Sequence, residues 1–219
     1  MPNEPTSPHP PGSRTRRRFL AIVTVSVAGG GLALGHVLRR REPPTPAATT
    51  LPAAQLGEWR VGSLLRIAPD GQVTLVSALS EIGQGVKTAL PMLVAEELEV
   101  DWARVQVEQG DLDPAHGDQF TGASRSVAKH HRRLRQLGAV ARTLLVRAAA
   151  TRWQVPESQC QAASGRVHHR ASGRSLDYGE LAVAAASMEP PDVASVPLKP
   201  ASEFRLIGQR IGGVDNLAI

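Results

Sequence analysis

The sequence predicts an α+β domain in which β-hairpins alternate with amphipathic helices. Apolar, β-branched runs flank glycine-containing turns, and two longer segments repeat apolar residues every three or four positions. The composition agrees with a packed core, since hydrophobic residues make up 42% and charged residues 21% of the 219 positions. Aromatic residues are only 3%, so Val, Leu and Ala must form most of that core.

Two hairpins and one further strand are expected. Each hairpin consists of two apolar runs around a turn that contains glycine: residues 64–68 and 72–78 around Pro69-Asp70-Gly71, and residues 167–169 and 175–176 around Ala171-Ser172-Gly173. Residues 104–108 alternate Val105 and Val107 with polar residues, which indicates a strand with one buried face.

Three helices are expected, at residues 86–98, 127–153 and 178–187. The longest keeps the spacing of one buried face at Leu134, Leu137, Ala141, Leu144, Leu145 and Ala148. We place the folded domain at residues 58–188. Residues 189–219, with prolines concentrated in their first twelve positions, are expected to form an extended connector.

The net charge of +5 lies entirely in the first 42 residues, which hold seven Arg and two Glu. Residues 43–219 are therefore neutral, which argues against a nucleic-acid partner. Thr15-Arg16-Arg17-Arg18-Phe19-Leu20 precedes an uncharged stretch at 19–38, the pattern of a twin-arginine export signal. We expect residues 1–42 to be such a signal and the protein to be periplasmic. Residues 19–38 as a membrane anchor are the alternative.

Residues 43–57 are rich in Pro and Ala and read as a linker after this leader. The single cysteine, Cys160, excludes a disulfide framework within one chain and is expected to be a small buried residue near a turn. His168 and His169 are adjacent in a predicted strand, so their side chains face opposite ways and poorly share a metal ion. No metal site and no catalytic residue is assigned.

The first candidate site is Gly83-Gln84-Gly85, between the second predicted strand and the helix at 86–98. Glycine lets backbone amides approach a ligand, and the helix start offers unpaired amides and partial positive charge. Gln84 can donate and accept hydrogen bonds, which suits the edge of a heterocycle. A plain tight connection is the alternative interpretation.

The second candidate site is Thr121-Gly122-Ala123-Ser124, followed by Arg125 and Ser126 at the start of the longest helix. Hydroxyls, a glycine and an arginine ahead of a helix make a phosphate cradle. The alternative is an ordinary helix cap formed by Ser124 or Ser126. The basic run at 130–135 is expected to be a solvated face, because it lacks interleaved aromatic residues.

The order of these motifs resembles a known family. Glu81-Ile82-Gly83-Gln84-Gly85-Val86-Lys87-Thr88, Thr121-Gly122-Ala123-Ser124, the helix segment at 138–145 and Tyr178-Gly179-Glu180-Leu181 look like the molybdopterin-binding subunit of the xanthine dehydrogenase superfamily, in its isoquinoline 1-oxidoreductase β-subunit and aldehyde dehydrogenase-like branch. The resemblance covers about residues 13–219. It departs at Ala123, where the family has a second glycine, and in the basic stretch at 129–133.

The resemblance implies a molybdenum–pterin cofactor of the cytosine dinucleotide type. Gly83, Gln84 and Gly85 would contact the pterin, and Thr121, Gly122 and Ser124 its phosphate or dinucleotide end. It also implies hydroxylation of aldehydes or N-heteroaromatics with water, an iron–sulfur small subunit as electron-accepting partner, and further large-subunit residues. The family's general-base glutamate has no counterpart here, and Glu81 belongs to the turn motif.

The sequence therefore predicts the N-terminal part of a molybdenum hydroxylase large subunit that is inactive alone. Two other functions remain open: an exported, non-catalytic module that binds a pterin or assists assembly, and a membrane-tethered scaffold domain without a cofactor.

Overall fold

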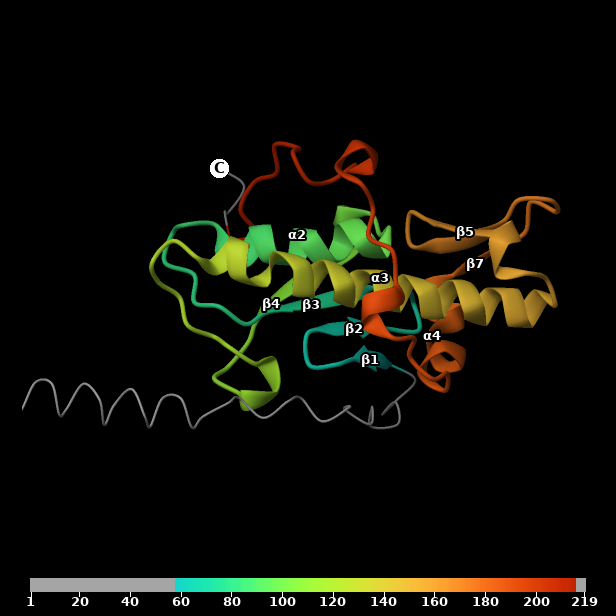
Figure 1. The fold of residues 1–219 in the computed structure, drawn as a ribbon, viewed down its shortest axis with the longest axis horizontal. Coiled ribbons are helices and arrows are strands. Elements are labelled where there is room, and N and C mark those ends of the chain that lie inside the picture. The colour runs from blue at the N-terminus through green and yellow to red at the C-terminus, as the bar shows by residue number, and fades with distance from the viewer. Residues whose placement is uncertain (1–57, 216–219) are drawn as a thin grey trace, which may run out of the picture. The chain divides into compact units, whose positions relative to one another are not determined.

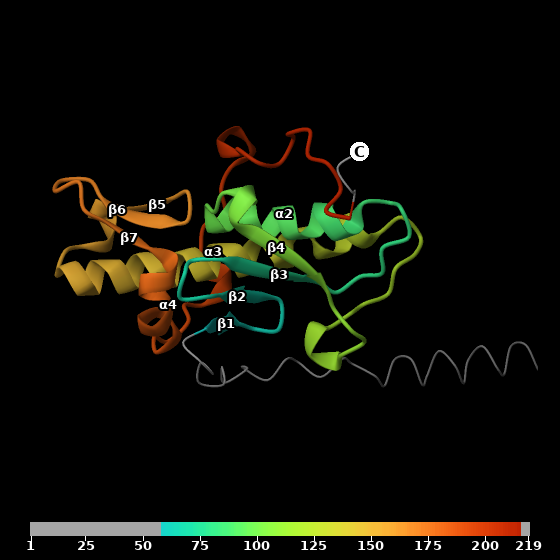
Figure 2. The ribbon, with the colours of Figure 1, turned by 180° about the vertical axis from the view of Figure 1, so that it is seen from behind.

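The computed structural model describes residues 58–215, which form two small sheets and three α-helices (Figures 1 and 2). The predicted leader at 1–42, with its stretch at 19–38, and the linker at 43–57 lie outside the described residues. No helix within residues 58–215 is both long enough and apolar enough to cross a membrane. The predicted α+β class is confirmed.

The larger sheet has four strands in the order β1-β2-β3-β4: β1 (Trp59–Val61), β2 (Leu65–Ile67), β3 (Val73–Ser77) and β4 (Val105–Gln109). The first predicted hairpin is confirmed as β2 and β3, which pair antiparallel with Leu65 opposite Leu75. β4 pairs parallel to β3, because the helix between them carries the chain back along the sheet. The prediction missed β1, whose three residues are too few for a periodic signal.

Helices α2 (Val86–Leu98) and α3 (Ser126–Trp153) lie side by side over this sheet (Figures 1 and 2). The first has the predicted bounds, and the second begins one residue earlier than predicted. They cross most closely at Gly138, where an added Cβ would lie 2.3 Å from the carbonyl oxygen of Val94. Only glycine fits at this crossing.

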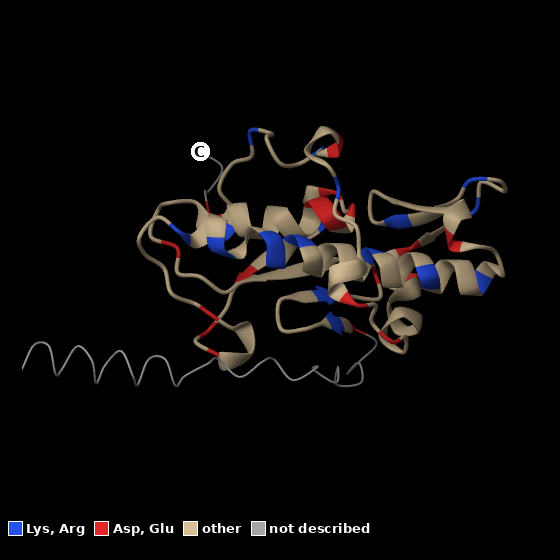
Figure 3. Ribbon diagram, in the orientation of Figure 1, with Lys and Arg blue, Asp and Glu red and all other residues tan. Residues whose placement is uncertain are grey.

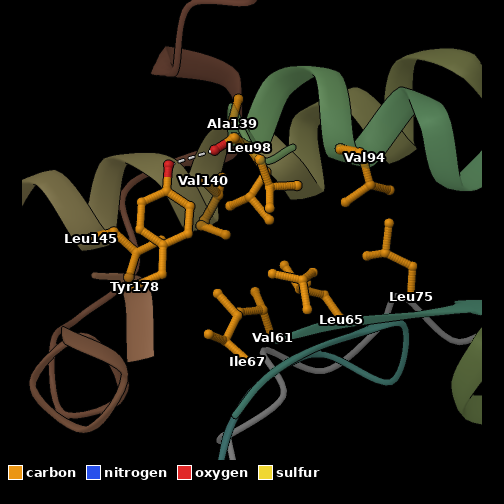
Figure 4. Close-up of a cluster of buried hydrophobic side chains, with 14 of the residues drawn as sticks. Val61, Leu65, Ile67, Leu75, Val94, Leu98, Ala139, Val140, Leu145 and Tyr178 are labelled. Carbon is orange, nitrogen blue, oxygen red and sulfur yellow. Dashed lines mark hydrogen bonds between the residues drawn. The ribbon is translucent and has the colours of Figure 1, made fainter. Parts of the chain in front are cut away.

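The core lies between the sheet and these two helices (Figure 4). Leu65, Ile67 and Leu75 from the sheet pack with Leu98 and Leu145 from the helices, and all five are at most 1% exposed. Tyr178, the first residue of α4 (Tyr178–Ala186), closes one end of the core and donates its hydroxyl to the Leu98 carbonyl at 2.7 Å. Burial raises the pKa of this phenol, so it stays a proton donor.

The smaller sheet packs beside the C-terminal half of α3 and consists of β5 (Cys160–Ala163), β6 (Arg166–His169) and β7 (Ser175–Asp177). The second predicted hairpin is confirmed as β6 and β7. The prediction missed β5, because two alanines, a cysteine and a glutamine carry little strand propensity. Cys160 begins this strand and is half-buried, so the prediction that it is a buried residue is wrong.

Residues 189–215 contain two 3₁₀ turns, Val193–Ser195 and Ala201–Glu203, and no strand or α-helix. This segment runs along the side of α2 that faces away from the larger sheet (Figures 1 and 2). It is attached by two buried carboxylates at the C-terminal end of α2, where acidic residues gather in Figure 3. Glu96 accepts hydrogen bonds from the backbone of Arg205, Leu206 and Ile207 and from the Lys199 ammonium.

Candidate functional site

The Gly83–Gly85 turn connects β3 to α2 and lies on the surface. Gly83 has φ +95° and Gly85, the residue that caps α2, has φ +80°. A Cβ added at either glycine would meet nothing within 4 Å. The positive φ angles therefore favour glycine at both positions. Among the described residues, the space beside the two glycines is open.

The carboxylate of Glu81 occupies the amides of this turn. Its Oε1 accepts from the backbone N–H of Gly83 at 2.8 Å and of Gly85 at 2.9 Å, and its Oε2 accepts from that of Lys87 at 2.8 Å. These hydrogen bonds, chiefly those from Lys87 and Gly85, lower the pKa of Glu81. The expectation that the start of α2 offers unpaired amides is wrong for these three positions, because a carboxylate of the same chain already fills them.

The side chain of Gln84 is folded back onto its own turn. Its Oε1 accepts from the backbone N–H of Ile82 at 2.6 Å, and its Nε2 donates to the carbonyl of Ser80 at 2.9 Å. Glu81 and Gln84 together fix the turn from inside. A ligand edge that pairs with the Gln84 amide must therefore replace these two local hydrogen bonds.

The loop at 121–124 has a different geometry. Ala123 and Ser124 both have positive φ, +53° and +54°. Arg125 occupies the cap position of α3, and no side chain caps the helix, so the alternative of a Ser124 or Ser126 cap is wrong. The first turn of α3 contains no acidic residue. Among residues 58–215, the start of α3 thus keeps the positive end of its helix dipole without a capping carboxylate, unlike the start of α2.

Thr121 presents an unsatisfied polar group in this loop. Its Oγ1 is buried and has no hydrogen-bond partner among residues 58–215. Gly122 lies against the ring of Phe120, where an added Cβ would be 2.7 Å from the nearest ring carbon. The chemistry here fits a phosphate group, since a hydroxyl without a partner and an uncapped helix start are both donors.

The two candidate loops lie at the same end of the helix pair (Figures 1 and 2), and Gln119 connects segments that lead into them. Its Nε2 donates to the carbonyl of Ala78 at 3.0 Å and to that of Asp111 at 2.8 Å, and its Oε1 accepts from the backbone N–H of Asp113 at 2.9 Å. Ala78 follows β3 and leads into the Gly83–Gly85 turn. Sequence reasoning missed Gln119, because its partners are 41 and 8 residues away.

The basic run at 130–135 is only partly a solvated face. His130 is buried, and burial together with Arg133 and Lys129 lowers its pKa, so its imidazole is neutral near pH 7. The Arg133 guanidinium donates to the His116 carbonyl at 3.2 Å from both terminal nitrogens. Arg135 donates to the buried Glu97 carboxylate at 2.6 Å. The prediction of a solvated face is therefore wrong for two residues. His130 is buried, and Arg135 binds both the Glu97 carboxylate and the Lys199 carbonyl in the segment at 189–215.

No group of three His, Cys, Asp or Glu side chains in the described part of the chain could hold a metal ion. His169 is buried, and its ring nitrogens contact Ser172 and Gln159, whereas His168 is half-buried on the other face of β6. This is the arrangement expected from their alternation in a strand.

A comparison with known protein families defines the class of protein to which this domain belongs. Residues 42–210 match the family described as the molybdopterin cofactor-binding domain. This match covers more than half of the chain, and the chain belongs to this family. The resemblance to the molybdopterin-binding subunit of the xanthine dehydrogenase superfamily is confirmed.

Two curated relatives are similar to the chain. Isoquinoline 1-oxidoreductase subunit beta of Brevundimonas diminuta is 41% identical over 177 residues, which are 76% of this chain and 21% of the relative. Membrane-bound aldehyde dehydrogenase (pyrroloquinoline-quinone) of Gluconacetobacter polyoxogenes is 38% identical over 145 residues, 65% of this chain and 18% of the relative. The chain therefore spans about a fifth of the length of these relatives.

A solved structure, quinoline 2-oxidoreductase from Pseudomonas putida 86, aligns with 55% of this chain and 15% of its own, at a TM-score of 0.44 and 21% identity.

Proposed function

We propose that this chain forms part of the cofactor site of a molybdenum-cofactor oxidoreductase and binds a molybdopterin of the cytosine dinucleotide type. Gly83, Gln84 and Gly85 contact the pterin, and Thr121, Gly122 and Ser124 contact the phosphate or dinucleotide end. One observation carries the assignment: the uncapped start of α3 follows a loop in which the buried Thr121 hydroxyl has no partner among the described residues, in a chain that belongs to the molybdopterin cofactor-binding family.

The contrast between the two helix starts supports this division of roles. The start of α2 already holds the Glu81 carboxylate, and a second anion beside it would be repelled. The start of α3 carries no such carboxylate and is followed by basic residues. The anionic end of a ligand is therefore favoured at Thr121–Ser124, and its heterocyclic end at the Gly83–Gly85 turn.

The reaction that we propose for the whole enzyme is hydroxylation of an aldehyde or an N-heteroaromatic compound with water. The names of the two relatives, an isoquinoline oxidoreductase subunit and an aldehyde dehydrogenase, support these substrate classes. When bound, the cofactor would supply the redox chemistry, and the residues of this chain would bind and orient it. An iron–sulfur subunit as electron acceptor and further large-subunit residues complete the proposal.

The first experiment measures molybdenum, pterin and cytidine monophosphate released from protein purified from its own host. Equal amounts of the three are expected. Replacing Thr121→Ala and Ser124→Ala together should lower the bound nucleotide at least several-fold. The control is Thr151→Ala, which removes an exposed hydroxyl from the last turn of α3.

The outcomes separate the alternatives. Cofactor without turnover in the natural assembly would favour a non-catalytic binding or assembly module. A protein that contains neither molybdenum nor pterin would favour a scaffold domain and contradict the proposal.

We also propose export to the periplasm by the twin-arginine route, from the motif that contains Arg16 and Arg17. Changing both to lysine should leave the protein in the cytoplasm, whereas changing Arg39 and Arg40 to lysine should not. Cell fractionation measures the result. If the variant with lysine at positions 16 and 17 is recovered with the membrane to the same extent as the unaltered protein, the alternative of an anchor at residues 19–38 is supported.

A further inference from the structure

A small cavity lies between the end of β3, the middle of α2 and the first turns of α3. Its volume is about 20 Å³. Apolar residues of the core, including Leu75, Leu90 and Val94, form one side. The other side is polar and consists of Ser77, His116, Asp118, His130 and Arg133.

Three of these polar side chains have an unsatisfied atom. Ser77 Oγ, His116 Nδ1 and His130 Nε2 are buried and have no hydrogen-bond partner among the described residues. Ser77 is 1% exposed and His130 is 5% exposed, so bulk water does not reach them freely. Buried polar atoms of folded proteins are nearly always hydrogen-bonded, to protein or to ordered water. Three residues with such atoms line one cavity, which is the arrangement that a shared hydrogen-bonding occupant requires.

The three residues come from segments that are far apart in the sequence. Ser77 is the last residue of β3, His116 ends the 3₁₀ turn Pro114–His116, and His130 lies in the second turn of α3. The His116 ring lies against Gly110, where an added Cβ would be 3.1 Å from its Nε2. An occupant of the cavity would therefore connect the strand that leads into the Gly83–Gly85 turn with the loop that leads to Thr121.

Charged groups of both signs lie on the polar side of the cavity. The Asp118 carboxylate forms an ion pair with Lys129, and both terminal nitrogens of Arg133 donate to the His116 carbonyl. His130 is neutral, because burial, Arg133 and Lys129 disfavour its protonated form. A cation would meet Arg133 and an anion would meet Asp118, and either ion would also lie against the apolar side of the cavity. These groups favour a neutral occupant.

The volume of the cavity and the hydrogen-bonding groups around it indicate which neutral molecule it can hold. A volume of about 10–15 Å³ of this kind accommodates one water molecule, so a cavity of about 20 Å³ has room for one. A hydroxyl and two imidazole nitrogens each donate or accept according to rotamer and tautomer. Water offers two donors and two acceptors, and it can satisfy all three atoms.

We propose that this cavity is a binding site for one internal water molecule that hydrogen-bonds Ser77 Oγ and His130 Nε2 and joins them to His116 Nδ1. The water links the end of β3 to the start of α3 and so helps to hold the two candidate loops in place. The proposal stands on the cavity and its three unsatisfied atoms, and it is independent of the cofactor assignment.

The test combines a crystal structure of the full chain at about 1.5 Å with thermal unfolding of Ser77→Ala. An ordered water should appear within hydrogen-bonding distance of Ser77 Oγ and His130 Nε2. The variant should unfold at a temperature a few degrees lower, because the water loses a partner. Ser80→Ala, which removes an exposed hydroxyl three residues further on, is the matched control and should leave this temperature unchanged.

If the cavity holds no water, the crystal structure shows no density in it. Ser77→Ala then raises the unfolding temperature, because it removes a buried hydroxyl that has no hydrogen-bond partner. If the Ser77 variant does not fold, nuclear Overhauser contacts between water and the His130 ring in the unaltered protein decide the question. Their presence supports the internal water, and their absence, or density for an occupant larger than water, overturns the proposal.

Discussion

Ala123 holds a backbone conformation that glycine adopts more easily. Its φ of +53° lies in the left-handed region, where a Cβ costs about 1–2 kcal/mol. The residue is exposed, so no packing contact of its methyl group compensates for this cost. The resemblance placed glycine at this position in related chains, and the geometry supplies the physical reason.

Ala123→Gly should therefore stabilise the protein by about 0.5–1 kcal/mol, after the greater flexibility of glycine in the unfolded chain is subtracted. Urea unfolding measures the change. The control Ala128→Gly, at an exposed position inside α3, should destabilise by about 1 kcal/mol. Equal destabilisation by both substitutions would show that Ala123 is not strained.

Glu81 acts on its own turn through its charge. Its pKa is lowered by the amides of Lys87, Gly85 and Gly83, so the folded state favours the carboxylate. The stabilisation is present above the ordinary pKa of about 4.3 and is lost as the pH falls through the lower pKa of the folded state. The turn is therefore expected to keep its shape at neutral pH and to loosen only in acid.

Glu81→Gln should remove this pH dependence and shift the amide resonances of Gly83, Gly85 and Lys87 at neutral pH, because a carboxamide cannot accept from all three as a carboxylate does. NMR titration of these amides is the measurement. Glu189→Gln, at an exposed glutamate outside the helices, serves as the control. Identical titration curves for the two variants would contradict the role of Glu81.

Among the elements, the contact between α2 and α3 depends on one residue. A Cβ on Gly138 would lie 2.3 Å from the Val94 carbonyl oxygen and 2.9 Å from the Glu97 Cβ, and backbone atoms cannot move aside as a flexible side chain can. The two helices would have to separate along their length. Both candidate loops lead directly into these helices, so the separation would also displace the loops.

Gly138→Ala should destabilise the protein by about 1–3 kcal/mol, in spite of the better helix propensity of alanine. Thermal or urea unfolding measures the loss. Gly212→Ala is the control, since a Cβ there meets nothing within 4 Å and the backbone is not in the left-handed region. A stabilising effect of Gly138→Ala would mean that the helices cross elsewhere.

The helices were predicted from the sequence more accurately than the short strands. The helix at 86–98 was predicted with its bounds and the longest helix to within one residue, because apolar periodicity repeats over several turns. β1 and β5 were missed because three or four residues provide no such repeat, whereas the equally short β6 and β7 were predicted from the glycine turn that joins them. The occupation of the α2 amides by Glu81 was missed as well, although Glu81 stands two residues before Gly83. A carboxylate shortly before a glycine turn is a signal that could have suggested it.

In the molecule as a whole, long-range polar contacts were beyond prediction. Glu96 and Glu97 are buried and bind the backbone of residues 199–207, about 100 positions away. Composition and periodicity place charged residues on the surface, and only the three-dimensional arrangement shows which partner buries them. The segment at 189–215 is therefore fixed on α2 by side chains that the sequence pattern alone assigns to solvent.

The largest exposed apolar side chains lie mainly on the two candidate loops and their flanks. Ile82 is 82% exposed, Leu112 is 91% exposed and Phe120 is 70% exposed. Scattered apolar residues are ordinary, but apolar side chains around a binding loop mark surfaces that other protein or ligand atoms cover. Under the proposed function, further large-subunit residues and the cofactor would cover them.

The purified chain alone is therefore expected to self-associate through these side chains. Changing Ile82 and Phe120 together to serine should shift it toward monomer, as measured by sedimentation velocity at increasing concentration. The control is Val183→Ser, which removes an apolar side chain 62% exposed on α4, away from both loops. If the unaltered chain, the double variant and the Val183 variant associate equally, Ile82 and Phe120 do not mediate the self-association. Loss of association with Val183→Ser alone would move the contact to α4.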